Sequence, residues 1–277
     1  MSIPSGTGSR PHQGRPVRDA STATSHAGST NAALEPAPGN ASERVGRRFG
    51  DRSPILVFGL LVLGGFLLLA ALAVGLGFLL VDVFLPINAV EQSDEAVTDW
   101  FASNRSPALS DASYVGSSIG DIPFIPGLVI LTALGAAILR RWRIAAFIVG
   151  AILVEVATYR VTSLIVHRDR PDVLRMDQLP VDQSYPSGHV AASVVVYVGL
   201  ALLISARLSS VRARALLWAV AIALPLIVAL SRMYRGMHHP IDASAGVLVG
   251  LGSIAIALFA TRAAVEAARV RAEGGRR

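Results

Sequence analysis

Six long apolar runs, separated by polar segments, dominate the pattern of this chain. The runs cover residues 54–85, 122–139, 144–166, 188–206, 215–232 and 240–261. A helix needs about 20 apolar residues to cross the hydrocarbon core of a bilayer, so each run is suited to a membrane-spanning helix. The first run is long enough to tilt or to extend beyond the bilayer. The pattern therefore predicts an all-α fold, an integral membrane bundle of six helices within residues 54–262.

The two ends of the chain are polar. Residues 1–53 are rich in Ser, Gly, Pro, Ala, Thr and Arg and contain almost no aromatic residues. Such a segment cannot bury enough apolar area to order itself, so we expect a disordered tail. No apolar core follows a short basic start, which argues against a signal peptide. Residues 263–277 are predicted to form a basic tail.

Composition agrees with a membrane protein. The chain is 52% hydrophobic and only 16% charged, with a mean hydropathy of +0.54, which is too apolar for an ordinary soluble domain. The absence of cysteine excludes disulfides and thiolate metal sites. All 25 basic residues are arginine, and the formal net charge is +6. Because these arginines lie beside apolar runs, we expect contact with the bilayer and no nucleic-acid partner. No obligate protein partner is inferred.

The arginines also predict an orientation. If the helices alternate, the N-terminal tail, the turn 140–143, the loop 207–214 and the C-terminal tail fall on one side. Cytoplasmic loops are enriched in Arg, so we expect a multi-pass plasma-membrane protein with both termini in the cytoplasm. The outer side carries the acidic loop 87–121. It also carries segments 167–189 and 232–239, which are rich in Arg and His. A functional anion site would explain this exception; the alternative is that the rule is only a bias.

Three polar clusters on that outer side favour a site for a tetrahedral oxyanion. They span residues 167–171, 186–189 and 231–242. Arginine guanidinium groups match phosphate oxygens with paired hydrogen bonds. Ser187 and Gly188 open the fourth run, where free N–H groups and the helix dipole favour an anion. Gly188 has no Cβ and lets the backbone come close.

The third cluster adds groups that can carry out chemistry. His238 and Asp242 are four residues apart, and they stack on one face if the sixth helix starts near Pro240. Asp242 could then hold one ring nitrogen of His238 and make the other a better nucleophile. His189 could donate a proton to the leaving oxygen. This division of roles suits phosphoryl transfer, where catalysis is mostly positioning and charge neutralisation.

These segments resemble the signature motifs of the type-2 phosphatidic acid phosphatase superfamily, which includes the lipid phosphate phosphatases and the vanadium haloperoxidases. The family pattern is Lys, six residues, Arg-Pro; then Pro-Ser-Gly-His; then Ser-Arg, five residues, His, three residues, Asp. This chain has "RP" at 170–171, "PSGH" at 186–189 and "SRMYRGMHHPID" at 231–242. The resemblance covers about residues 139–261, and the six-helix layout extends it to about residue 54.

The resemblance implies a role for each matching residue. His238 would attack phosphorus and form a phosphohistidine, Asp242 would orient it, and His189 would protonate the leaving group. The phosphate oxygens would be bound by the remaining matches, which are Arg170, Arg232, Ser187 and the N–H of Gly188. The family needs no metal for this reaction, so the resemblance implies neither a metal site nor another cofactor.

One position departs from the family pattern. The lysine expected seven residues before Arg170 is replaced by Ser163. Arg160 lies about one helical turn before Ser163, and we hypothesise that Arg160 or Arg168 replaces the lost charge. One alternative is that Arg160 pairs with Glu155 inside the third helix, shielded from lipid. Another is a reduced activity or an unusual substrate.

We therefore expect a membrane phosphatase with its active site at the outer face, acting on an amphiphile. Candidate substrates are phosphatidate, phosphatidylglycerol phosphate and polyprenyl mono- or diphosphate. The all-arginine, alanine-rich composition suggests a GC-rich bacterium, which favours a polyprenyl diphosphate. Two alternatives stay open: a phosphotransferase of the same chemistry, and a non-catalytic membrane transporter or scaffold with a decayed site.

Overall fold

The computed structural model describes residues 31–178 and 183–275, and within them the fold is all-helical. Five helices in this part of the chain are long and apolar enough to cross a membrane. They are α2 (Pro54–Phe78, continued by the π-helical turn η3, Leu79–Phe84), α6 (Trp142–Ile165), α7 (Gly188–Ser205), α8 (Val211–Tyr234) and α9 (Pro240–Gly274). The predicted all-α fold is thereby confirmed, and the five helices fit a multi-pass membrane protein.

The remaining predicted span forms the shorter helix α5 (Phe124–Ile138). At about 1.5 Å per residue it is roughly 22 Å long, which is less than the hydrocarbon core of about 30 Å. Pro123 is its N-cap, and Arg140, with a φ of 57°, turns the chain sharply into α6. The structure thus contains five candidate spans and one short apolar helix in the described residues.

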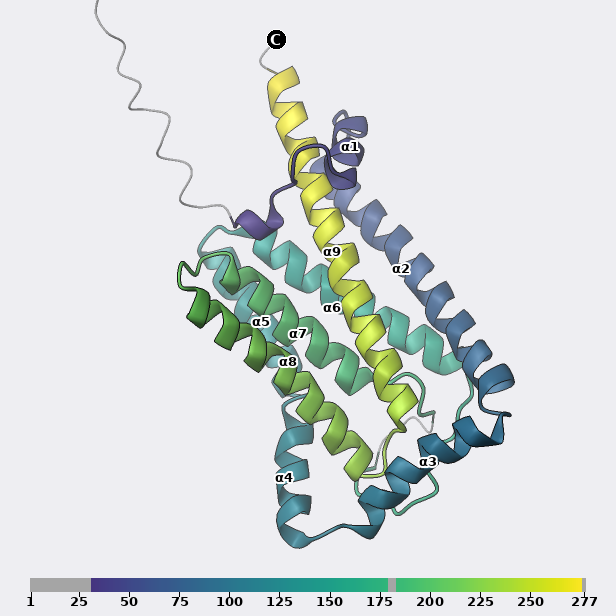
Figure 1. Cartoon of the computed structure of the whole chain (residues 1–277). Coiled ribbons are helices and arrows are strands. Elements are labelled where there is room, and N and C mark those ends of the chain that lie inside the picture. Colours follow the sequence, from purple (N-terminus) through teal and green to yellow (C-terminus); the bar gives the residue numbers. More distant parts are fainter. Residues whose placement is uncertain (1–30, 179–182, 276–277) are drawn as a thin grey trace, which may run out of the picture. The chain divides into compact units, whose positions relative to one another are not determined.

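Helix α9 lies at the centre of the bundle and packs against α2, α6 and α7 (Figure 1). Two glycines on α9 allow the approach to α7. A Cβ on Gly246 would lie 2.5 Å from the carbonyl oxygen of Ser187, and one on Gly250 would lie 2.7 Å from that of Ala191. Since Ser187 directly precedes α7, this contact fixes the start of α7 against the first turns of α9.

The acidic loop 87–121 forms two helices, α3 (Asn88–Ser103) and α4 (Pro107–Ser118). Both lie at the end of the bundle where α8 ends and α9 begins (Figure 1). Arg105, in the connection between them, donates hydrogen bonds of 3.2 and 3.0 Å to the carbonyl of Tyr234. The two helices therefore bring acidic and polar side chains to this end of the bundle.

The expectation of a disordered segment 1–53 differs from the structure over residues 31–53. This stretch forms the short helix η2 (Ala32–Leu34) and helix α1 (Ala41–Arg48). Leu34 is fully buried in the main apolar core, and the Asn31 side chain donates to the carbonyl of Leu203 at 2.8 Å. The segment is ordered because the bundle, not the segment itself, supplies the apolar surface. Residues 1–30 lie outside the described residues.

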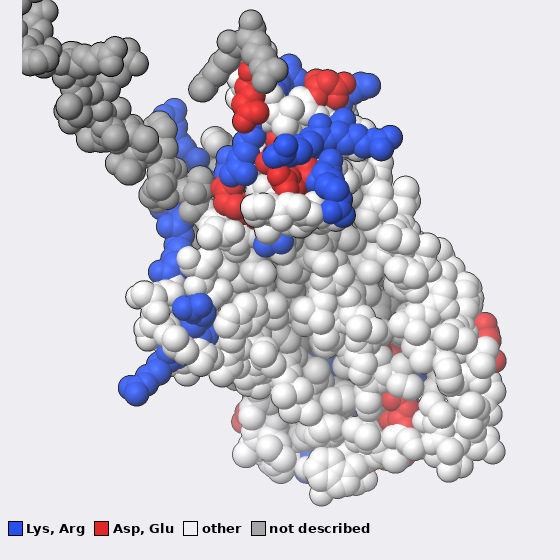
Figure 2. Space-filling view, turned by 45° about the horizontal axis from the view of Figure 1, so that its top comes forward, with Lys and Arg blue, Asp and Glu red and all other residues white. Residues whose placement is uncertain are grey.

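The predicted basic tail 263–277 is helical as far as Gly274, because α9 continues without a break. Its alanine-rich sequence has a high helix propensity. Ala263 and Ala267 pack against Val57, and Glu266 pairs with Arg47 of α1 at 3.1 Å. Arginine and acidic side chains gather at this end, over α1 and the last turns of α9 (Figure 2).

Candidate active site

The three predicted polar clusters meet at one end of the bundle, where α6 and α8 end and α7 and α9 begin (Figure 1). The backbone N–H of Ser187 donates to the carbonyl of Asp242 at 3.0 Å. Arg170, from the first cluster, donates to the carbonyl of Met237 in the third. The expectation that these segments lie together is therefore met in the structure.

A tight turn at Gly236 directs the third cluster inward. Gly236 has a φ of 70°, a conformation that L side chains rarely adopt. A Cβ here would also lie 2.8 Å from Val173 and 3.0 Å from the carbonyl of Leu174. The turn is closed by a 3.0 Å hydrogen bond from the N–H of Met237 to the carbonyl of Arg232. Glycine is thus required where the chain leaves α8 for the site.

His238 is buried, and its Nδ1 lies 2.8 Å from the carbonyl oxygen of Ser184. A carbonyl can only accept, so this contact places the ring proton on Nδ1 and leaves the lone pair on Nε2. Burial and the positive charge of Arg232 hold the pKa of His238 well below its ordinary value. The ring is therefore neutral at pH 7, which is the form that a nucleophile needs.

Asp242 does not make the contact predicted for it. Its Oδ2 is 4.0 Å from Nδ1 of His238, which is too far for a hydrogen bond. It accepts instead from the backbone N–H of His239 at 2.8 Å and also bonds Arg168. The spacing argument failed because His239 is the N-cap of α9, so His238 lies outside the helix and the i, i+4 relation does not apply.

Two buried groups next to this histidine have hydrogen-bonding atoms without partners. Arg232 is 1% exposed, and its Nη1 bonds Ser117 at 3.0 Å and Asp177 at 2.9 Å. Its Nε and Nη2, and the hydroxyl of the fully buried Ser187, have no hydrogen-bond partner among the described residues. Such buried donors are rare in folded proteins. Their position beside the N-terminus of α7, which begins at Gly188, suits a bound oxyanion.

The two arginines of the first cluster have different surroundings. Arg170 is buried and donates to the carbonyl of Gln183 at 3.0 Å, and its charge acts on His238. Arg168 is also buried, but its two terminal nitrogens bond the carboxylates of Asp94 and Asp242. Arg168 thus neutralises buried acids, so the hypothesis that it replaces the missing lysine is not supported by its contacts.

Arg160, the other hypothesised replacement, is exposed. Its guanidinium lies 5.9 Å from the centroid of the Tyr159 ring, and it lines a cavity together with His189. Among the described residues no ion pair joins it to Glu155, which contradicts the alternative that the two pair within the helix. Ser163 is buried and donates its hydroxyl to the carbonyl of Arg160 at 3.2 Å.

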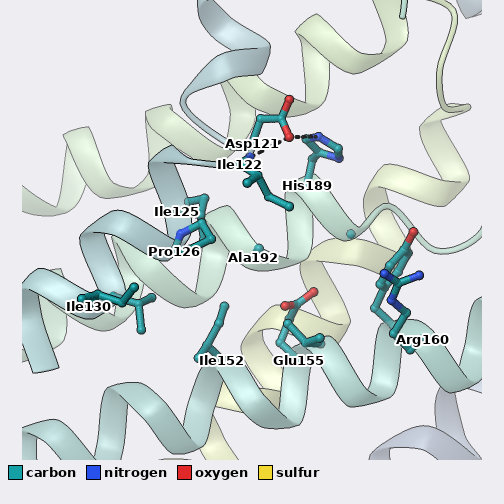
Figure 3. A pocket seen from close by; sticks show the side chains of 15 residues that line it. Asp121, Ile122, Ile125, Pro126, Ile130, Ile152, Glu155, Arg160, His189 and Ala192 are labelled. Carbon is teal, nitrogen blue, oxygen red and sulfur yellow. Dashed lines mark hydrogen bonds and ion pairs between the residues drawn. The ribbon is translucent and has the colours of Figure 1, made fainter. Parts of the chain in front are cut away.

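His189 is paired with a residue that the sequence patterns did not identify. Its Nε2 lies 3.2 Å from Oδ1 of Asp121, in the connection between α4 and α5 (Figure 3). The contact with His189 lowers the pKa of Asp121 below its ordinary value, against the opposing effect of burial. The carboxylate is therefore ionised and can orient the imidazole.

Asp177 is a second site residue missed by the motifs. It bonds Arg232 and also Arg235, whose Nε lies 2.8 Å from its Oδ2. Burial alone would raise the pKa of Asp177, but the hydrogen bond from Arg235 and the charge of Arg232 outweigh burial and lower it. The ionised carboxylate holds one side of Arg232 and leaves Nε and Nη2 for another anion. Within residues 31–178 and 183–275, no three His, Cys, Asp or Glu side chains are grouped to hold a metal ion.

Comparisons with known proteins agree with the motifs. Residues 143–265 match the model of the PAP2 superfamily. Phosphatidylglycerophosphatase B of Bacillus subtilis is 24% identical over 175 residues, which cover 63% of this chain and 86% of the relative. Undecaprenyl-diphosphatase of Sulfolobus acidocaldarius is 31% identical over 107 residues, or 39% of this chain and 48% of the relative.

A solved structure shares the fold. The crystal structure of the first transmembrane PAP2-type phosphatidylglycerolphosphate phosphatase from Bacillus subtilis superposes with a TM-score of 0.58 at 23% identity. The superposition covers 74% of this chain and 94% of that one. The matched segment 143–265 contains all three polar clusters that meet in the structure. The segment that carries the site is therefore similar to the PAP2 superfamily.

Proposed function

We propose that this protein is a membrane-embedded phosphatase that hydrolyses a lipid phosphate or a polyprenyl (di)phosphate at the outer face of the membrane, through a phosphohistidine. One observation carries the proposal. A neutral, buried His238 lies with the unpartnered donors of Arg232 and Ser187 at the ends of α7, α8 and α9. This set offers both a nucleophile and a binding site for an oxyanion.

Binding of the phosphate uses groups that lack other partners. Nε and Nη2 of Arg232 and the hydroxyl of Ser187 donate to its oxygens, and the N-terminus of α7 at Gly188 adds the helix dipole. Arg170 contributes its charge from the opposite loop. These donors neutralise the charge that spreads over the phosphoryl oxygens in the transition state.

The reaction then proceeds in two displacements. Nε2 of His238 attacks phosphorus while the bond to the ester oxygen breaks, and the leaving oxygen takes a proton from His189. The carbonyl of Ser184 holds the Nδ1 proton of His238 throughout. Water next attacks the phosphohistidine, gives a proton to His189, and releases phosphate and free His238. His189 thereby returns to its protonated form.

Two further observations support the location and the substrate class. The arginine-rich segments lie at the end of the bundle opposite the site, which the positive-inside bias assigns to the cytoplasm. The relatives phosphatidylglycerophosphatase B and undecaprenyl-diphosphatase are named for amphiphilic phosphates. The site lies among apolar helices, where such a substrate keeps its chain in the bilayer.

A panel of lipid phosphates tests the proposal. Purified protein in detergent should release inorganic phosphate from phosphatidate, phosphatidylglycerol phosphate or undecaprenyl diphosphate. His238→Ala should lose roughly a thousand-fold or more of this rate, because no other nucleophile is in place. Release without an added acceptor separates a hydrolase from a phosphotransferase. No release from any lipid, or equal release by His238→Ala, would refute the proposal.

A further inference from the structure

A cavity of about 480 Å³ adjoins the site beside His189, between α5, α6 and α7 (Figure 3). Most of its lining is aliphatic, from residues such as Ile125, Pro126, Val129, Ile130, Ile152 and Val156. Helix α6 adds two charged side chains, Glu155 and Arg160. The lining suits a hydrocarbon chain, but it also contains a carboxyl group that a hydrocarbon cannot satisfy.

Glu155 is the unusual member of this lining. It is 1% exposed, and its carboxyl group points into the cavity (Figure 3). Its Oε2 has no hydrogen-bond partner among the described residues, and no ion pair there joins it to Arg160. A buried carboxyl without a partner is costly, more so within a membrane-spanning helix. We therefore expect the molecule that occupies the cavity to supply the hydrogen bond that Glu155 lacks.

The carboxyl group lies close to where the phosphate is proposed to bind. Tyr159 follows Glu155 by one helical turn, and its ring would be 3.1 Å from a Cβ on Gly188 at the start of α7. One turn advances a helix by about 6 Å for four residues. Glu155 lines the same cavity as Gly188 and His189, so its carboxyl group faces the part of a substrate that extends from the phosphate into the cavity.

We propose that the cavity holds the leaving alcohol of the substrate, and that Glu155 accepts a hydrogen bond from a donor on the carbon next to the phosphate ester. The donor is a hydroxyl or an ammonium group, and a single hydrocarbon chain fills the apolar remainder. This inference rests on the proposed function and names the substrate class of the same site. Phosphatidate and polyprenyl diphosphates have no such donor, so they would not form this hydrogen bond with Glu155.

A pair of synthetic substrates that differ in one hydroxyl gives the sharpest test. Monooleoylglycerol phosphate carries the free hydroxyl, and its propanediol analogue lacks only that group. The wild-type protein should favour the hydroxyl ester by about 10-fold or more in kcat/KM, since an unmatched buried polar group penalises the analogue. Sphingosine phosphate, with an ammonium at the same carbon, shows which donor is preferred. Equal kcat/KM for the two esters would overturn the proposal.

Variants assign the effect to one side chain. Glu155→Leu should bring the ratio of the two esters close to one, because it relieves the penalty on the analogue and removes the hydrogen bond to the hydroxyl ester. Glu155→Gln should retain part of the preference. Thr158→Val is the matched control, because Thr158 is also buried on α6 with an unpartnered hydroxyl but does not line the cavity. Its ratio should equal that of the wild type.

The outcomes separate the two proposals. An unchanged ratio in Glu155→Leu would refute the role of Glu155, and if that variant does not fold, Glu155→Gln and the wild-type ratio decide. Hydrolysis of both esters at equal rates would refute the proposed selectivity but would still support the phosphatase activity. No hydrolysis of any lipid phosphate, including those of the wider panel, would instead refute the proposed function.

Discussion

At the scale of single residues, the ring of His238 is held by a backbone carbonyl and not by a carboxylate. Ser184 fixes the proton on Nδ1, while Asp242 caps α9 and pairs with Arg168. A carboxylate in direct contact would stabilise the protonated ring, whereas burial and the nearby arginines disfavour it. The arrangement keeps the nucleophile neutral, and the carboxylate of Asp242 forms its ion pair with the buried Arg168.

This arrangement predicts the pH dependence of the reaction. Burial and Arg232 lower the pKa of His238, so the ring gains its proton only well below pH 6.5, the ordinary value for histidine. The acid limb of a kcat/KM profile should therefore lie below pH 6.5, because activity is lost only when Nε2 is protonated. Rates of phosphate release between pH 4 and pH 8 would measure it. An acid limb above pH 6.5 would contradict the geometry.

The sequence identified the motif residues of the site, but not the acidic side chains that contact them. His238, Arg232 and Ser187 stand in spaced patterns that identify them. Asp177 and Asp121 are single acids in connecting segments, and nothing in their spacing shows that one meets Arg232 and the other His189. Such contacts depend on the path of a loop, which hydrophobic periodicity does not encode.

At the scale of elements, the bounds of the apolar helices were predicted to within a few residues, except for the end of α9. Helices α7 and α9 begin at Gly188 and Pro240, as expected from a glycine turn and from proline in a first turn. The end of α9 was missed because the arginines of this segment suggest a polar tail. In the structure its Ala263 and Ala267 are buried against Val57 and Val45. Helix α1 was missed because its partner surface belongs to α9.

The close contact between α7 and α9 should be sensitive to one methyl group. Gly246→Ala places a Cβ only 2.5 Å from the carbonyl oxygen of Ser187, so the backbone must move. We expect a loss of about 1–3 kcal/mol in stability, as for other overpacked sites. Because Ser187 belongs to the site, phosphate release should also fall. Thermal unfolding in detergent and the hydrolysis rate measure both effects.

Gly59→Ala is the control for that substitution. Gly59 lies in α2 with nothing within 4 Å of an added Cβ. The alanine should leave activity unchanged and raise stability slightly, because it lowers the entropy of the unfolded chain. Equal behaviour of the two variants would show that the contact at Gly246 does not position the site.

At the scale of the whole molecule, the two ends of the bundle differ in chemistry. The end with α1 and the last turns of α9 carries interspersed arginines and acids on its surface (Figure 2). At the other end, Arg168, Arg232 and Arg235 are buried and paired with aspartates. An excess of exposed arginine is typical of the cytoplasmic side, so the site is expected to face outward.

The cysteine-free chain allows a direct test of this orientation. Asn104, between α3 and α4, and Ser209, between α7 and α8, are both exposed but lie at opposite ends. In intact cells a membrane-impermeant maleimide should label Asn104→Cys and should label Ser209→Cys only after permeabilisation. The reverse pattern would place the site on the cytoplasmic side.

The central claim is that His238 forms a covalent bond to the phosphoryl group of a lipid phosphate. Purified protein would be mixed with a lipid phosphate that it hydrolyses, radiolabelled in the phosphoryl group. The mixture would be quenched in alkali, which preserves phosphohistidine, and analysed by peptide mass spectrometry. The account predicts one phosphoryl group on the peptide that contains His238, and none in His238→Ala. Hydrolysis of the lipid with no label on that peptide, or label that persists in His238→Ala, would contradict it.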